Sequence, residues 1–144
     1  MFVIDVEGAV ERDGRYLMIV RGLNESESPG ALGFPGGKVE PTDDPKNTLE
    51  SAVRREILEE VGVEVHPEIT YVESGLFDMV DGRRAMFVIF LCRYKSGTPE
   101  PDSGGEVESV QWMTPEQVRR DGPPWLGESI QAVEKVRRRV GGQQ

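Results

Sequence analysis

Three glutamates on one short stretch of predicted helix are the residues of this chain best suited to chemistry. Glu56, Glu59 and Glu60 lie within residues 55–63, and positions 56 and 60 of a helix are one turn apart, about 6 Å of rise. Carboxylate oxygens at that spacing can share one divalent cation. The alternative interpretation is a solvated acidic helix with salt bridges along its surface.

The phase of the helix distinguishes the two interpretations. At about 100° per residue, the positions that share one arc of about 100° are Ala52, Glu56, Leu49, Glu60 and Val53, with Glu59 at the edge of the arc. An apolar stripe of this kind is the face that a helix buries. Charged groups on a buried face are costly unless they are paired or bound to a metal, so the pattern favours a metal site.

A glycine-rich turn precedes the helix. Gly36 and Gly37 follow Pro35, and glycine lets the backbone come close to a ligand. The turn and the helix together resemble the box of the Nudix hydrolases: Gly, five residues, Glu, seven residues, then Arg-Glu-apolar-any-Glu-Glu-any-Gly-apolar. The second half matches at every specified position, namely Arg55, Glu56, Ile57, Glu59, Glu60, Gly62 and Val63.

The first half of the box departs from the family pattern. Counting six from Gly37 gives Asp43, whereas counting eight back from Arg55 gives Asn47, so the loop at residues 41–46 is four residues too long. We align Asn47 with the family's first glutamate, because the helical phase must be preserved through Arg55. An amide lacks the charge of a strong Mg²⁺ ligand or a base, which leaves the role of that first glutamate open.

The start of the helix has two alternatives. Asp44 could cap it with Pro45 at the first helical position. Asn47 could instead cap it together with Glu50 three residues on, as a capping box. Both place Arg55 well inside the helix.

The resemblance implies a metal site and a fold. Mg²⁺, with Mn²⁺ as a substitute, would be held by Glu56, Glu59 and Glu60 with the backbone carbonyl of Gly37. Arg55 would orient a neighbouring glutamate, which suits its planar fork. The implied fold is the α/β/α sandwich of the Nudix family, a mixed sheet flanked by helices, in a single domain over residues 1–144.

A further carboxylate resembles one that many Nudix proteins place on a loop facing the metal. Glu106 lies six residues before Trp112, with Glu108 two residues further on. The alternative is that both face solvent from a strand. The catalytic base would be Glu56, Glu59 or Glu106, and substrate-binding residues stay unassigned.

The implied activity is Mg²⁺-dependent cleavage of a phosphoanhydride bond in a nucleoside triphosphate or a nucleoside diphosphate-linked compound. Asn47 and the long loop motivate one alternative, a non-catalytic nucleotide-binding sensor. A third hypothesis is an isoprenoid diphosphate isomerase. The single cysteine, Cys92, argues against an isomerase because it lies inside a predicted strand, residues 84–94.

Composition limits the partners. The net charge of −9 disfavours a nucleic acid polymer, which requires a basic face, but it is compatible with a small nucleotide bound through a metal. No signal peptide and no apolar stretch of membrane-spanning length is evident. We expect a cytoplasmic protein of 144 residues with no membrane partner, and a sheet edge or the N-terminal strand as a basis for a homodimer.

Alternating strands and helices must position these residues. Turn signals and periodicity predict strands at residues 3–10, 16–20, 68–77, 84–94 and 106–113, and helices at 48–61, from 114 onward, and at 126–140. A hairpin is expected at residues 12–14, and Gly62 is a natural helix C-cap. Polar loops at residues 22–30 and 95–105 carry no recognisable motif.

Overall fold

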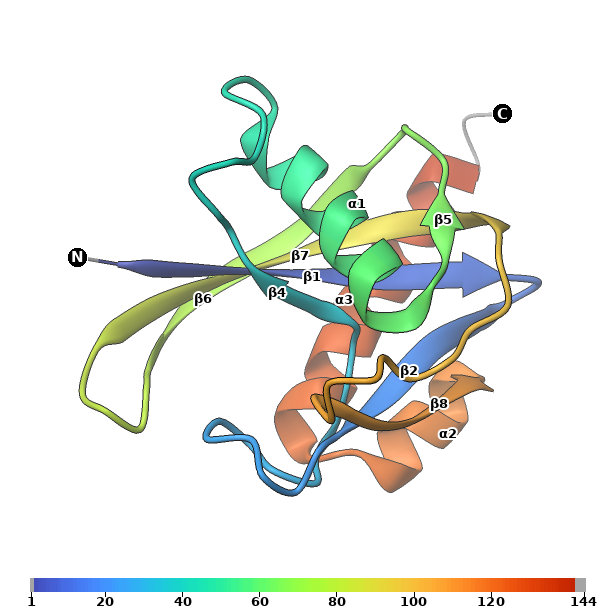
Figure 1. Cartoon of the computed structure of the whole chain (residues 1–144). Coiled ribbons are helices and arrows are strands. Elements are labelled where there is room, and N and C mark those ends of the chain that lie inside the picture. The colour runs from blue at the N-terminus through green and yellow to red at the C-terminus, as the bar shows by residue number, and fades with distance from the viewer. Residues whose placement is uncertain (1, 142–144) are drawn as a thin grey trace.

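The computed structural model describes residues 2–141 of the chain, which form eight strands and three helices (Figure 1). In chain order they are β1 (Val3–Arg12), β2 (Arg15–Arg21), β3 (Leu32–Gly33), β4 (Gly36–Lys38), α1 (Thr48–Val61), β5 (Glu64–Val65), β6 (Thr70–Asp78), β7 (Arg84–Ser96), β8 (Val107–Met113), α2 (Pro115–Asp121) and α3 (Pro124–Gly141).

Helix α1 has the bounds that the sequence predicts. It ends at Gly62, which adopts a left-handed conformation with φ 72° and donates its N–H to Leu58, as expected for a glycine after a helix. Asn47 is the N-cap residue, but the predicted capping box is wrong. Asn47 is itself left-handed, with φ 52°, and its side chain makes no cap hydrogen bond.

The sheet is mixed, with β1 near its centre. Strand β1 runs parallel to β7 and antiparallel to β2 and β4. Its N-terminal half pairs with β4 and its C-terminal end with β2, so the chain between these two partners passes close to the middle of β1. The register Val6↔Gly37 therefore fixes the glycine-rich turn beside β1.

Several predicted bounds need correction. Strands β3, β4 and β5, of two or three residues each, were not predicted because so short a segment shows no alternation of polar and apolar residues. Strand β8 begins at Val107, so Glu106 is the last residue of the preceding loop rather than a strand residue. Helix α3 begins at Pro124 rather than at residue 126, since proline is well suited to a first helical turn.

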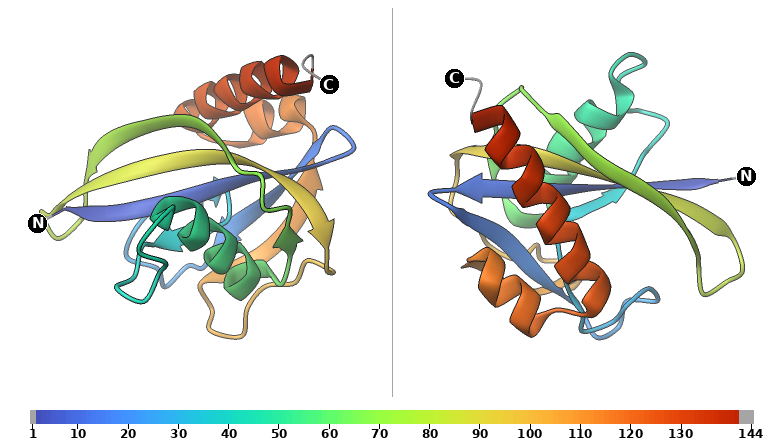
Figure 2. Two further views of the ribbon diagram at one scale, coloured as in Figure 1. Left: turned by 90° about the horizontal axis from the view of Figure 1, so that it is seen from above. Right: turned by 180° about the vertical axis from the view of Figure 1, so that it is seen from behind.

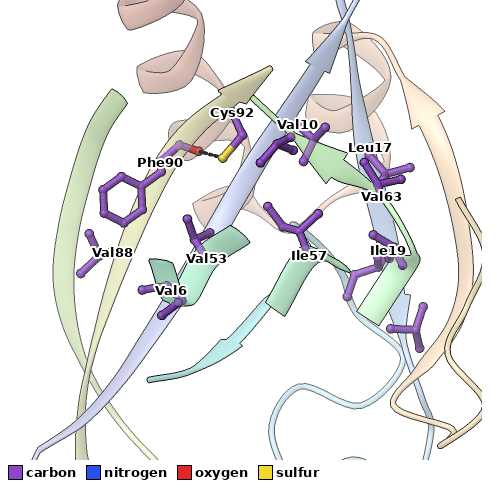
Figure 3. Close-up of a cluster of buried hydrophobic side chains, with 14 residues drawn as sticks. Val6, Val10, Leu17, Ile19, Val53, Ile57, Val63, Val88, Phe90 and Cys92 are labelled. Carbon is purple, nitrogen blue, oxygen red and sulfur yellow. Dashed lines mark hydrogen bonds between the residues drawn. The ribbon is translucent and has the colours of Figure 1, made fainter. Parts of the chain in front are cut away.

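Two apolar cores lie on the two faces of the sheet, and the predicted α/β/α sandwich is confirmed (Figure 2). On one face, Val53 and Ile57 of α1 pack against β1 and β7 (Figure 3). On the other face, α2 and α3 bury Val118, Leu126 and Ile130 against the sheet. Full burial of each such side chain contributes about 1.5–3 kcal/mol.

Cys92 lies in β7 and is fully buried, as predicted. Burial raises the pKa of its thiol to about 12, which makes it an unreactive core residue. None of the helices among residues 2–141 combines the length and apolar character that crossing a membrane requires.

Candidate active site

The glycine-rich turn brings the backbone of β4 against the acidic side of α1. A Cβ atom on Gly37 would lie 2.2 Å from Oε2 of Glu56, a distance that excludes any side chain there unless the carboxylate moves. The N–H of Gly36 donates to Oε1 of Glu60 at 3.2 Å. Close approach therefore requires glycine at Gly37, beside Glu56, and at Gly36, where a Cβ would collide with the carbonyl oxygen of Val6. Two of the predicted metal-binding carboxylates contact this turn.

Glu60 is a buried carboxylate, as the helical phase predicts. It is 7% exposed, and its pKa is raised to about 8, chiefly by burial and further by the negative charges of Glu56 and Glu106. The Gly36 hydrogen bond and the positive charge of Arg21 oppose this increase. A carboxyl group in such surroundings is stabilised by a cation.

Glu56 lies one turn earlier and is also largely buried, with 14% of its side chain exposed. Burial is the main cause that raises its pKa, and a hydrogen bond from Arg55 is the main cause that lowers it. Glu56 and Glu60 therefore form a desolvated acidic pair facing β4, in the phase expected from the sequence.

Arg55 connects the helix to the loop before it. Its Nη1 donates to Oε1 of Glu56 at 2.7 Å and to Oε2 of Glu59 at 3.1 Å. Its Nη2 donates to the carbonyl of Lys38 at 3.0 Å. Arg55 thus forms ion pairs with both neighbouring glutamates, and its orienting role at a metal site stays a prediction.

Asp43 is the residue that completes the hydrogen bonding of Arg55. Its two carboxylate oxygens accept from Nε at 2.6 Å and from Nη2 at 2.9 Å, a bidentate pair of the strong kind. The guanidinium covers the Asp43 side chain, which is 1% exposed. These hydrogen bonds hold the pKa of the Asp43 carboxyl below its usual range.

Asp43 is therefore the acidic partner that the loop supplies to Arg55. The alignment put Asn47 at the first glutamate of the box, but Asn47 is exposed at the start of α1. The longer loop returns Asp43 to the helix, where the N–H of Glu40 also donates to it at 2.7 Å. Counting forward from Gly37 would have identified Asp43; counting back from Arg55 did not.

The two remaining predicted carboxylates are exposed. The Glu59 side chain is 61% exposed and contacts Arg55. Glu106 lies in the loop immediately before β8, where its carbonyl accepts from the N–H of Gly22 at 2.9 Å. Its negative charge raises the pKa of both Glu56 and Glu60, so it lies near the same site. Glu108 is an exposed residue of β8.

No three His, Cys, Asp or Glu side chains between residues 2 and 141 are spaced as a ready-made metal cluster. Glu56 and Glu59 are turned to Arg55, and Glu60 to Gly36. The possible ligands are carboxylate oxygens, and Mg²⁺ prefers oxygen ligands. The glycine backbone beside them carries no side chain that would block an ion. The residues fit a hard divalent cation in kind.

Sequence reasoning missed three charged groups near this site. Arg21 lowers the pKa of Glu60 and also those of Asp5 and Glu7 on β1. Alternation along β1 would have placed Asp5 and Glu7 on one face of the sheet. Arg21 itself donates to the carbonyl of Glu27 at 2.7 Å.

Comparisons with known proteins agree with the geometry. The family model described as NUDIX domain matches residues 4–133. The nucleoside triphosphatase NudI of Escherichia coli O1:K1 / APEC is 29% identical over 118 residues, which is 76% of this chain and 79% of that protein.

Two solved structures are similar over most of their length. The MutT NUDIX hydrolase from Burkholderia pseudomallei superimposes with a TM-score of 0.77 at 25% identity, covering 92% of this chain and 98% of that one. The E. coli ORF135 protein does so with a TM-score of 0.72 at 27% identity, covering 94% and 91% of the two chains.

Proposed function

The chain belongs to the NUDIX domain family, and we propose that it is a Mg²⁺-dependent pyrophosphohydrolase of nucleoside triphosphates or nucleoside diphosphate-linked compounds. The family assignment supports a hydrolase that acts on an acid anhydride. The relative named as a nucleoside triphosphatase supports a nucleotide as the substrate.

One observation carries the proposal. The desolvated pair of Glu56 and Glu60 faces the backbone of Gly36 and Gly37, beside Arg55, which binds Glu56 directly. Burial and the charge of Glu56 raise the pKa of Glu60, which is unfavourable for a site that stays without a cation. The arrangement is therefore suited to a hard divalent ion.

Each residue would have a distinct task in the reaction. Glu56, Glu59 and Glu60, with the carbonyl of Gly37, would hold the cation. When bound, the cation would neutralise phosphate oxygens and make an adjacent water more acidic. Arg55 would keep the Glu56 carboxylate oriented.

A general base must also accept the proton of the attacking water. Glu56, Glu59 and Glu106 are the candidates, since each is a carboxylate close to this site. The exposed position of Glu59 and Glu106 leaves both free to reach a bound substrate.

The alternatives lose support. The hypothesis of a non-catalytic sensor arose from Asn47 and the long loop, but the same loop supplies Asp43 as the carboxylate partner of Arg55. The isomerase hypothesis lacks a reactive thiol, because Cys92 is fully buried.

The proposal is tested by assaying the purified protein on nucleoside triphosphates and sugar nucleotides, with Mg²⁺ or with EDTA. We expect phosphate products only with Mg²⁺. A folded protein that releases no such product from any of these substrates would refute the proposal.

Glu60→Gln tests the metal site directly. We expect weaker Mg²⁺ and Mn²⁺ binding by at least about tenfold in calorimetric titration, because one anionic ligand is lost, with the fold unchanged in circular dichroism. Glu50→Gln removes a carboxylate from the first turn of the same helix and serves as the control. Equal metal titrations of the two variants would contradict the role of Glu60.

A further inference from the structure

The loop that carries Glu106 is fastened to the rest of the molecule at two places. It is the β7–β8 loop, residues 97–106, and Figure 1 shows it crossing in front of β2 before it enters β8. Near its middle, the N–H of Glu100 donates to the carbonyl of Val61 at 3.0 Å. The last carbonyls of a helix have no partner within the helix, so this hydrogen bond docks the loop on the C-terminal end of α1.

The end of the loop meets the residue that follows β2 in a contact that only glycine permits. The N–H of Gly22 donates to the carbonyl of Glu106 at 2.9 Å. A Cβ on Gly22 would collide with the carbonyl oxygen of Gly105 and lie 3.2 Å from the carbonyl carbon of the same residue. Both are backbone atoms, which cannot rotate aside as the end of a side chain can. The peptide that joins Gly105 to Glu106 therefore lies directly against the backbone of Gly22.

An irregularity in the pairing of β2 with β8 lies beside this contact. Val20 is paired with Ser109, but the next residue, Arg21, is paired with Val107. Glu108 is therefore an extra residue of β8, which is the pattern of a β-bulge, and bulges are frequent next to active sites, where they redirect a side chain. The alternation of β8 is interrupted just where the strand meets the loop, so the position of the loop acid depends on the contact at the end of β2.

Gly22 is held in place by the closed base of the loop that follows β2. The N–H of Arg21 donates to the carbonyl of Ala31 at 2.9 Å, and the N–H of Gly30 donates to the carbonyl of Arg21 at 3.0 Å. Residues 101–105 of the β7–β8 loop, by contrast, form no backbone hydrogen bond with any other part of residues 2–141. A side chain added at Gly22 would therefore displace the β7–β8 loop rather than β2.

The acid at the end of this loop lies close to the acidic pair of α1. The negative charge of Glu106 is one cause of the raised pKa of both Glu56 and Glu60. Glu106 is exposed, so its carboxylate is open to a bound ion or substrate. The attraction between a carboxylate and a cation falls with the distance between them. The place of the peptide before Glu106 therefore decides how much this acid contributes to the site.

We propose that Gly22 is a positioning residue of the active site: the absence of a side chain at this position lets the β7–β8 loop lie against the end of β2 and holds Glu106 beside Glu56 and Glu60. This inference rests on the proposed function for the nature of the cation and of the reaction. Gly22 itself contacts neither, and acts through Glu106. Alanine at position 22 would keep every carboxylate of the site and change the place of one.

The first test measures Mn²⁺ binding by calorimetry, without nucleotide, in Gly22→Ala, Glu106→Gln and the double variant. Each single change should weaken binding about fivefold, the size expected for one charge at an exposed position. The double variant should bind no more weakly than Glu106→Gln alone, since two changes that act on one interaction do not add. Gly33→Ala is the matched control, because a Cβ there meets no heavy atom within 4 Å, and it should bind as the wild-type protein does.

The second test measures kcat for a nucleoside triphosphate with Mg²⁺ in the same variants. We expect Gly22→Ala to lower kcat about 100-fold, since displacing a reacting group by about 1 Å can cost that much. The double variant should have the kcat of Glu106→Gln. If the effects of the two changes multiply, in kcat or in Mn²⁺ binding, Gly22 does not act through Glu106 and the inference is overturned.

Hydrogen exchange of the metal-free protein tests the placement of the loop without metal or turnover. In Gly22→Ala, the amide of residue 22 loses its hydrogen bond to Glu106 and should exchange at least about tenfold faster, after correction for the intrinsic rate. The amide of Gly62, bonded to Leu58 at the end of α1, should keep its protection and so show that the fold is retained. Unchanged protection of residue 22 would overturn the inference.

The outcomes separate this inference from the proposed function. If the wild-type protein hydrolyses no nucleotide, the proposed function fails, while non-additive Mn²⁺ binding still supports the role of Gly22. If the protein also binds no Mn²⁺, the exchange of the amide at residue 22 decides whether Gly22 fixes the place of Glu106. If hydrolysis occurs but Gly22→Ala keeps the wild-type kcat and Mn²⁺ affinity, the inference alone is overturned.

Gly105→Ala changes the same contact from the other side and replaces Gly22→Ala if that variant does not fold. Gly105 has φ +80°, and a Cβ there meets no heavy atom within 4 Å. Alanine avoids this backbone conformation, so the turn before Glu106 should change without a steric clash. Gly105→Ala should weaken Mn²⁺ binding in the wild-type background and have no further effect in Glu106→Gln. A further loss in that background would overturn the inference.

Discussion

At the scale of single residues, Asp43 is the least expected member of the site. It binds Arg55 through two hydrogen bonds while Arg55 also holds Glu56 and Glu59. An arginine with this many acceptors is fixed in orientation, and the hydrogen bonding that Arg55 donates to Asp43 is the largest cause that raises the pKa of Arg55. Asp43 thus positions the metal-binding carboxylates through Arg55.

Asp43→Asn should weaken that positioning without unfolding the chain. We expect kcat/KM to fall about 10–100-fold, the usual cost of losing a group that supports ligands. Asp44→Asn, one residue along the same loop and exposed, is the control and should leave kcat/KM unchanged.

The double variant with Arg55→Lys distinguishes positioning from a general loss of charge. Since both changes break the same pair, their effects on kcat/KM should not add. Additive effects, or equal effects of Asp43→Asn and Asp44→Asn, would show that Asp43 does not act through Arg55.

At the scale of elements, β4 decides the geometry of the site although it has only three residues. It pairs with the N-terminal half of β1 and packs against α1 at the same time. Its glycines permit the close approach of the Glu56 carboxylate and allow one N–H to reach Glu60. The strand thereby joins the core of the sheet to the acidic face of the helix.

Gly37→Ala should damage the site rather than the fold. The new Cβ would lie 2.2 Å from Oε2 of Glu56, and Glu56 is held by Arg55 at 2.7 Å, so the carboxylate must leave its place. A displacement of about 1 Å can cost about 100-fold in rate, and we expect a decrease of that order in kcat. Thermal unfolding should show nearly the same melting temperature.

Gly33→Ala on β3 is the matched control, because a Cβ there meets no heavy atom within 4 Å. It should retain both activity and stability. If the two variants have the same kcat, close approach at Gly37 is not required for the reaction.

At the scale of the whole molecule, acidic groups on both faces of the sheet influence stability. Burial raises the pKa of Asp5 and Glu56 and brings those of Glu7 and Glu60 to about 7 and about 8. The ordinary pKa of glutamate is 4.5. Between this pH and about pH 8, the folded chain therefore binds more protons than the unfolded chain. The free energy of unfolding therefore falls as the pH rises through this range.

We expect the metal-free protein to lose about 5 kcal/mol of stability between pH 5.5 and pH 8.5, since each unit of pKa difference is worth about 1.4 kcal/mol. Urea unfolding at a series of pH values measures this loss. Glu7→Gln should reduce the slope, whereas Glu68→Gln should leave it unchanged. A stability that is constant or increases over this range would contradict the prediction.

The sequence by itself determined the helix at residues 48–61, the burial of Glu60 and the family. Periodicity and the fixed spacing of Arg55, Glu56, Glu59 and Glu60 are local properties, and a helix converts local spacing directly into a common face. The positions of the longer strands along the chain could be predicted for the same reason, from the alternation of polar and apolar residues and from turn residues.

Only the tertiary structure decided which acid pairs with Arg55 and which residues surround the site. Asp43 reaches Arg55 because a loop folds back across twelve positions. Glu7 of β1 comes near Glu73 because β1 pairs with β7, which lies far along the sequence. The path of a loop and the register of non-local strands depend on packing of the whole chain. Spacing along the sequence offered both Asp43, counted from Gly37, and Asn47, counted from Arg55, and it could not decide between them.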